Sequence, residues 1–259
     1  MVKDLLKKGY LFLVFFFLYA PILILVVFSF NQSKSRANWT GFTLDWYSQL
    51  FRDRQILDAL YNTITIGVLS AVIATIIGTA AAIGIYNMKK YPRMMLMNVT
   101  YLPVLNPDIV TGIALMLLFI FMKMPLGYLT LLLAHITFNI PYVILSVLPK
   151  LMQLNKHIFE AAIDLGATPL YAYRKVVLPQ ISSGVITGLL IAFTLSIDDF
   201  VISFFTTGSG VSNVAITIYS MARRGINPKI NALLTLMFSG VLVLLFIIYK
   251  RSLKENIEV

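Results

Sequence analysis

The chain alternates long apolar runs with shorter polar connections. Six runs stand out, at about 10–30, 64–86, 94–121, 126–148, 181–205 and 232–249. A helix needs about 20 apolar residues to cross a ~30 Å hydrocarbon core, and each run is close to or above that length. None shows the period-two alternation of a barrel strand, and an open sheet edge cannot satisfy its backbone in lipid. The pattern predicts an all-α integral membrane protein with six transmembrane helices, forming a single domain over residues 1–259.

Composition supports this interpretation. Hydrophobic residues make up 59% of the chain and charged residues 12%, whereas about a quarter of residues are charged in soluble domains. There is no cysteine, so disulfides and thiolate metal sites are excluded, and we predict no metal site and no catalytic residue. The net charge of +10 comes from basic residues scattered at the ends of apolar runs, which favours lipid headgroups over nucleic acid. The first run is too long for a secretory signal, and we expect it to be a retained span.

Basic residues are distributed unequally between alternate connections. Thirteen Lys and Arg residues lie in the set that contains both termini, the 87–93 turn and the 149–179 loop, and eight lie in the opposite set. Cytoplasmic connections carry the excess of positive charge in membrane proteins. We therefore expect both termini on the cytoplasmic side and the connections 31–59 and 207–230 outside. Trp39, Trp46 and Tyr219 in these outer connections fit an interfacial aromatic belt or a partner-docking surface.

The longest cytoplasmic connection, residues 149–179, has an ordered pattern. Ile158, Ala161 and Leu165 repeat at helical spacing, Gly166 can end a helix with a left-handed residue, and Pro169 can open the next one. This predicts a short helix, a sharp bend and a second helix that leads back to the membrane. A rigid helix at the inner mouth of a bundle can fit the groove of a soluble partner.

Residues of this loop carry a resemblance to a known family. At the family's spacing stand Glu160, Ala161, Ala162, Gly166, Leu178 and Pro179, with Val176 in place of the usual isoleucine. The pattern resembles the EAA loop of ABC importer permeases, and the resemblance implies the type I importer fold. It also implies that this loop couples the membrane helices to a cytoplasmic ATPase. No Walker A pattern occurs in the chain, so ATP and Mg²⁺ are expected to bind the partner, and the chain is expected to be a transport subunit and not an enzyme.

Three of the eleven acidic residues lie within predicted spans: Asp108, Asp198 and Asp199. A carboxylate at the bilayer centre costs at least about 2.5 kcal/mol, and such residues usually face a bundle interior or a watery cavity. No Lys or Arg lies within any predicted span to pair with them. Pro103 and Pro107 are expected to break or kink the third span beside Asp108. The three carboxylates are therefore predicted to line an outward-facing passage for a cation, and a salt bridge or hydrogen bond to a neighbouring helix is the structural alternative.

Four further stretches resemble spermidine/putrescine permeases of the PotC type: "GFTLDWYSQLF", "NPDIV", "HITFNIPYV" and "SIDDFVISFFTTG". The resemblance implies a permease subunit in a bacterial inner membrane that forms half of a polyamine channel. It implies a second permease of the PotB type, two copies of a PotA-type cytoplasmic ATPase and a PotD-type extracytoplasmic polyamine-binding protein.

The same residues are compatible with two other functions. A secondary cation transporter also uses intramembrane carboxylates, but it should show an inverted repeat. An intramembrane aspartyl protease needs two Asp on facing helices, which Asp108 and Asp198 would mimic. His135, Asn139 and Tyr142 share one face of the fourth span, where helix-to-helix hydrogen bonding is favoured over a place on the transport route.

Overall fold

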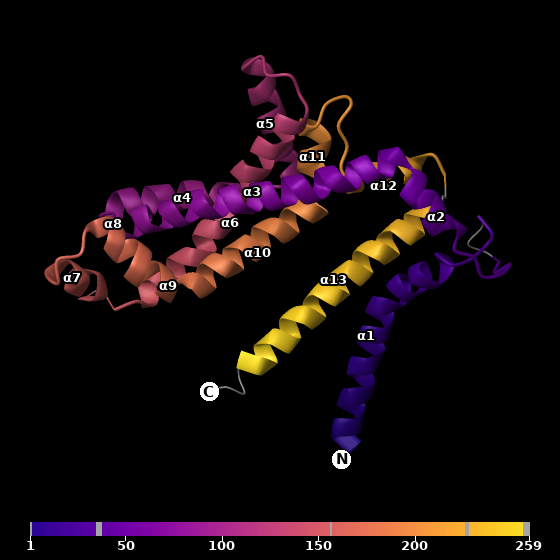
Figure 1. The fold of residues 1–259 in the computed structure, drawn as a ribbon, viewed down its shortest axis with the longest axis horizontal. Helices are drawn as coiled ribbons and strands as arrows, with labels where there is room; N and C mark the ends of the chain where they lie inside the picture. The colour runs from indigo at the N-terminus through magenta and orange to yellow at the C-terminus, as the bar shows by residue number, and fades with distance from the viewer. Residues whose placement is uncertain (1, 35–37, 156, 226–227, 256–259) are drawn as a thin grey trace. The chain divides into compact units, whose positions relative to one another are not determined.

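The computed structural model describes residues 2–34, 38–155, 157–225 and 228–255. These residues form helices and one isolated β-bridge between Asn31 and Phe42, which confirms the all-α class (Figure 1). The chain divides into two compact units, residues 1–57 with 217–259 and residues 58–216, and each is described by itself. The elements are α1 (Val2–Phe28), α2 (Asp45–Arg52), α3 (Arg54–Tyr86), α4 (Lys90–Leu105), α5 (Asp108–Phe121), α6 (Tyr128–Gln153), α7 (His157–Asp164), α8 (Pro169–Ala172), the π-helical turn η1 (Tyr173–Val177), α9 (Leu178–Gln180), α10 (Ser182–Asp198), α11 (Val201–Thr206), α12 (Val214–Arg223) and α13 (Pro228–Glu255).

Three helices of the described chain are long and apolar enough to cross a membrane, at Lys7–Phe28, Arg54–Tyr86 and Tyr128–Gln153. Two bent pairs raise that number to five if each pair is one span, α4 with α5 and α8–α9 with α10. The predicted sixth run falls in α13, whose side chains from residue 243 onward lie outside the described residues. Six spans with both termini inside the cell remain predictions.

The third predicted span is broken where the prolines indicated. Pro103 is accommodated inside α4, whereas Asn106 and Pro107 are extended, with ψ of 144° and 138°. Proline disfavours the helical conformation of the residue before it, so α4 ends at Leu105. The chain turns by 107° before α5 begins at Asp108. The break beside Asp108 is confirmed, and Pro107 is its cause.

The fifth predicted span, 181–205, is wrong as one continuous helix. Helix α10 ends at Asp198, Asp199 is extended with ψ of 124°, and α11 begins at Val201. The cause of the break lies in the contacts of Asp199, described below.

Helices α3 and α10 both pack closely against α6 at Val143, which is fully buried. A Cβ atom added at Gly78 of α3 would lie 2.7 Å from the Val143 Cβ, and one at Gly188 of α10 would lie 3.2 Å from the Val143 Cα. One turn earlier on α10, a Cβ at Gly184 would lie 2.9 Å from the carbonyl oxygen of Ser146. Small residues at this spacing let helix backbones approach within a membrane. These contacts make α6 the centre of the unit 58–216.

Gly188→Leu is expected to destabilise this helix contact. A side chain forced against the Val143 backbone costs about 1–3 kcal/mol or more through overpacking. We expect a lower thermal unfolding midpoint of the detergent-solubilised protein and less monodisperse protein in size-exclusion chromatography. Gly84→Leu on α3 is the matched control, because nothing lies within 4 Å of its added Cβ. Equal loss in both variants would contradict the packing role.

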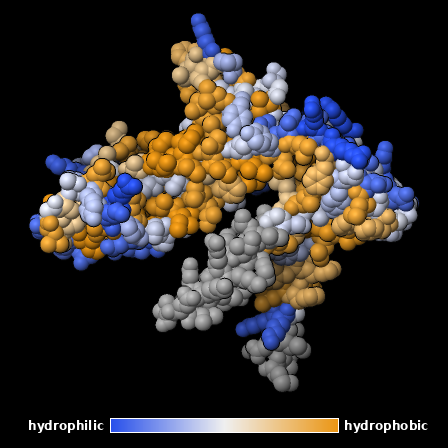
Figure 2. Space-filling view, in the orientation of Figure 1, coloured by the Kyte–Doolittle hydropathy of each residue, from blue (hydrophilic) through white to orange (hydrophobic). Residues whose placement is uncertain are grey.

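Large apolar side chains also cover much of the exposed surface. Leu117, Ile120 and Phe121 of α5 are exposed, as are Tyr91 and Met95 of α4. Figure 2 shows the visible face over α3 and α4 dominated by hydrophobic residues. Soluble monomers rarely expose continuous apolar surface of this extent, so these faces are expected to contact lipid or other membrane helices.

Candidate functional site

The packing of α5 against α11 brings the three acids that were predicted to be intramembrane to one end of this helix pair. A Cβ added at Gly112 of α5 would lie 3.3 Å from the Ile202 Cα. Beyond the other ends, a Cβ at Gly208 would lie 2.6 Å from the Leu126 carbonyl oxygen. The two helices therefore run in the same direction with their N-termini side by side. Asp108 opens α5, one turn of about 6 Å before Gly112. Asp198 ends α10, and only Asp199 and Phe200 separate it from the start of α11 at Val201.

Asp108 and Asp198 are both exposed. Neither forms a hydrogen bond or ion pair with another described residue. Asp108 lies in the first turn of α5, where the positive end of the helix dipole stabilises a negative charge. Both carboxylates are therefore open to a ligand from outside the chain.

Asp199 is held inside the protein by four contacts. Its Oδ1 accepts the backbone N–H of Ile202 at 3.1 Å, and its Oδ2 accepts both the backbone N–H and the hydroxyl of Ser203 at 2.7 Å. The same Oδ2 lies 3.5 Å from His135 Nε2, and only 7% of the Asp199 side chain is exposed. The carboxylate caps the first turn of α11 as Asp caps other helices. This capping explains why the predicted fifth helix is interrupted.

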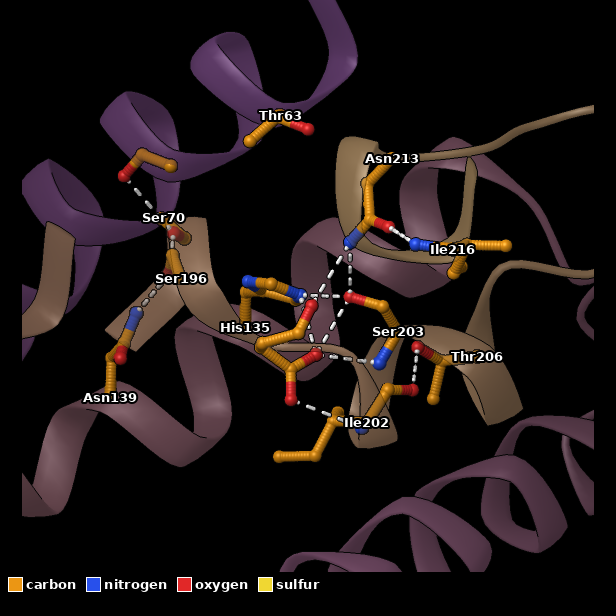
Figure 3. Close-up of polar contacts among 12 residues, drawn as sticks. Thr63, Ser70, His135, Asn139, Ser196, Ile202, Ser203, Thr206, Asn213 and Ile216 are labelled. Atoms are coloured by element: carbon orange, nitrogen blue, oxygen red, sulfur yellow. Dashed lines mark hydrogen bonds and ion pairs between the residues drawn. The ribbon is translucent and has the colours of Figure 1, made fainter. Parts of the chain in front are cut away.

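Ser203 is the centre of the cluster around Asp199 (Figure 3). Its hydroxyl lies 3.0 Å from His135 Nε2 and accepts the amide of Asn213 at 2.8 Å. The Ser203 hydroxyl donates its proton to Asp199, so it can only accept a hydrogen bond from His135. The proton of the neutral imidazole is therefore on Nε2. The Asn213 amide also donates to the Asp199 carbonyl at 3.2 Å, and its Oδ1 accepts the N–H of Ile216. The cluster joins α6, α11 and the segment that leads into α12.

This cluster contains Ser, His and Asp but lacks the geometry of a catalytic triad. In a triad the serine and the carboxylate lie at opposite nitrogens of the imidazole. Here Ser203 and Asp199 both face Nε2, and His135 and Ser203 are buried. The cluster therefore has a structural role, and the helix-to-helix role of His135 is confirmed.

A second buried cluster joins three helices by hydroxyl and amide groups. Ser196 Oγ lies 2.9 Å from Ser70 Oγ and accepts the Asn139 amide at 2.8 Å (Figure 3). All three residues are buried. The helix-to-helix role of Asn139 is confirmed, whereas Tyr142 packs edge-on against Phe138 within α6.

The sequence reasoning missed Asn213 and the central position of Ser203. The Asp199 to Ser203 spacing, with a carboxylate four residues before a hydroxyl, was a usable signal for a local cap. No signal pointed to Asn213, because it follows a glycine-containing turn at 208–210 and reaches Ser203 only through the fold.

The loop 149–179 has the predicted form. Helix α7 ends at Asp164, Gly166 takes a φ of +88°, and Pro169 opens α8 behind Thr168, whose hydroxyl accepts the N–H of Tyr171. Such a positive φ suits glycine because other residues meet a steric penalty there. Leu178 and Pro179 form α9, which leads into α10.

One side of helix α7 packs against the bundle, and its other side is exposed to solvent. The rings of Phe159 and Tyr173 lie 4.6 Å apart, and the Tyr173 hydroxyl accepts the Asn87 amide at 2.9 Å. Beyond α7, the side chains of Leu165 and Leu170 are 89% and 79% exposed. Glu160 is also exposed and lies 2.9 Å from Nδ1 of His157, the first residue of α7, whose own side chain is 82% exposed. The loop presents a rigid apolar surface away from the bundle.

Comparison with known proteins identifies the family. Residues 74–254 match the family described as binding-protein-dependent transport system inner membrane component. The chain belongs to this family. It is 38% identical over 244 residues to the spermidine/putrescine transport system permease protein PotC of Escherichia coli strain K12, covering 94% of this chain and 92% of that protein. It is 40% identical over 259 residues to the putrescine transport system permease protein PotI of the same strain, covering 96% and 92%.

Solved structures of ABC transporters share this fold. A bacterial ABC transporter for the acidic polysaccharide alginate matches with a TM-score of 0.71 at 18% identity, over 98% of this chain and 96% of that one. The inward-facing MetNI methionine ABC transporter matches with a TM-score of 0.62 at 14% identity, over 81% and 97%. The chain is therefore a multi-pass inner membrane permease with the type I ABC importer fold.

Proposed function

We propose that this permease forms half of the membrane channel of an ATP-driven importer for spermidine or putrescine. The observation that carries the proposal is the pair of exposed carboxylates, Asp108 and Asp198, at the shared end of α5 and α11 with no basic partner among the described residues. The resemblance to PotC and PotI supports the same cargo.

The charge of the site suits a polyamine. Carboxylates that line a passage select for cations, and opposite charges a few ångströms apart attract strongly where water is scarce. Asp108 and Asp198 lie on different helices, so they are suited to two ammonium groups of one elongated cargo. An anionic or neutral cargo would gain nothing from these charges.

Asp199 has a different part in this proposal. The Asp199 carboxylate fixes the start of α11. It thereby also fixes the position of Asp198, the residue before Asp199. The Asp199 oxygens already accept hydrogen bonds from Ile202 and Ser203. The role in the transport pathway that the sequence suggested for Asp199 remains a prediction.

The complete importer requires partners. A second permease completes the channel, two copies of a cytoplasmic ATPase bind ATP and Mg²⁺, and an extracytoplasmic binding protein delivers the cargo. Glu160, Ala161, Ala162 and Gly166 form the contact with the ATPase, and Leu178 and Pro179 carry its movement into α10. Alternating exposure of the channel is then a two-state equilibrium that nucleotide biases.

Asp108→Asn combined with Asp198→Asn is expected to lower spermidine uptake about tenfold or more, because a hydrogen bond to a charged group contributes about 1.5–3 kcal/mol. The measurement is ATP-dependent uptake by the complete importer in proteoliposomes, with a sugar as negative control. Asp58→Asn removes an exposed carboxylate from α3 in the same unit and should transport normally.

Two outcomes would contradict the proposed function. Unchanged uptake in the double variant would remove the role of the two carboxylates. Uptake that persists on an ion gradient without ATP would favour a secondary cation transporter instead.

A further inference from the structure

A cationic pocket lies in the unit formed by residues 1–57 and 217–259. Its volume is about 520 Å³, and its walls come from the connection after α1, from α2, from the turn between α2 and α3, and from the α12–α13 connection. Lys34, Arg224 and Lys229 line it, together with a single carboxylate, Asp53. Three positive charges therefore face one negative charge.

One of the three cations is neutralised locally. Lys229 Nζ lies 3.1 Å from Asp53 Oδ2, and both side chains are largely shielded from solvent. Lys34 and Arg224 are exposed, and neither forms an ion pair with a described carboxylate. Two uncompensated positive charges remain in one concave surface, so the pocket favours an anionic occupant and repels a polyamine.

The pocket is formed before any partner arrives. Trp46 is buried in its wall, and its indole N–H donates to the Asn31 carbonyl at 2.7 Å. Helix α2 packs against α13, and the Lys229 to Asp53 ion pair ties the first turn of α13 to the turn before α3. A preorganised pocket loses little conformational entropy when a partner binds.

We propose that this pocket receives carboxylate side chains of the extracytoplasmic binding protein. The inference rests on the proposed function and on the predicted outside location of the connections that contain Lys34 and Arg224. A protein that binds a polycation must itself carry carboxylates, and those at its rim complement the two free cations. The two charged sites then have different roles. The cationic pocket binds the delivering protein, while Asp108 and Asp198 attract the cargo. Complementary charges at a docking surface raise the association rate and fix the orientation of the partner.

The test combines Lys34→Glu with Arg224→Glu in the complete importer, assembled in nanodiscs and checked for assembly by size-exclusion chromatography. Binding of the cargo-free binding protein is measured by biolayer interferometry at low and high salt. We expect the affinity to fall at least about tenfold at low salt, with most of the loss in the association rate, and the salt dependence to weaken.

Arg224→Gln and Arg223→Gln form a matched pair of single variants. Arg223 is the preceding residue, but its guanidinium lies 5.8 Å from the ring centre of Tyr219 and does not line the pocket. We expect weaker docking for Arg224→Gln and unchanged docking for Arg223→Gln. Equal effects in the two variants would overturn the proposal, because they would report overall charge and not the pocket.

Full affinity in the charge-reversed double variant would also overturn it. If that variant also loses co-purified anionic phospholipid, the pocket is a lipid site. Docking is measured without cargo, so its failure is distinct from a failure of spermidine uptake by the unmodified importer, which would contradict the proposed function itself.

Discussion

Asp199→Ala is expected to leave little folded permease in the membrane, whereas Asp198→Ala, one residue earlier, is expected to assemble normally. The substitution removes the acceptor for two backbone N–H groups and the Ser203 hydroxyl. Each buried donor left without an acceptor costs about 1–3 kcal/mol. The side chain of Asp198 has no such contacts and is exposed. The measurement is the yield and thermal unfolding midpoint of each variant after detergent extraction.

Asp199→Asn distinguishes the capping of α11 by this side chain from the effect of its negative charge. The amide keeps one oxygen acceptor for the α11 backbone but removes the negative charge beside His135. We therefore expect a stability between that of the unmodified protein and that of Asp199→Ala. If Asp199→Ala instead folds normally and loses only uptake, the capping role is wrong and the pathway role predicted from the sequence gains support.

The two helix breaks show which features a sequence can reveal. The break before Asp108 was predictable because proline acts locally: Pro107 disfavours a helical Asn106 whatever surrounds it. The break at Asp199 was missed because residues 181–205 form one apolar run and hydropathy does not register a helix cap, although the spacing from Asp199 to Ser203 is a local signal for one. The surrounding contacts with His135 on α6 and with Asn213 after the turn at 208–210 join residues far apart in the chain, so no local pattern predicts them.

The candidate site also combines features that the sequence predicts with features that depend on the fold. Hydropathy alone predicts an intramembrane location for Asp108, Asp198 and Asp199, and this prediction selected them as a group. Their different roles depend on three-dimensional neighbours. Asp199 contacts Ser203 and His135, while Asp108 and Asp198 are exposed and form no hydrogen bond or ion pair with a described residue. By contrast, the 149–179 loop was predictable in detail because Gly166 and Pro169 determine its bend through local backbone preferences.

Glu160→Lys is expected to uncouple ATP hydrolysis from transport in the complete importer. Glu160 is exposed at the start of α7 and lies 2.9 Å from His157. It also lines a cavity of about 380 Å³ between α7 and the bundle, where Arg93 provides the opposite charge. A lysine there would place a like charge in the same cavity as Arg93 and would move α7, with its Phe159 ring, away from Tyr173. ATPase activity should then persist while spermidine uptake falls about tenfold or more.

The control for this variant is Asp164→Lys, which makes the same charge change on the same exposed helix. Asp164 lies one turn beyond Glu160 and does not line the cavity. We expect it to retain most of its coupling, measured as spermidine molecules transported per ATP hydrolysed. If both variants lose coupling equally, the general charge of the docking helix is responsible. If neither does, α7 does not transmit ATPase closure, and the exposed Leu165 and Leu170 must be tested as the contact instead. Loss of coupling in Glu160→Lys alone would show that movement passes through the contact of α7 with the bundle, from which η1 and α9 lead along the chain into α10.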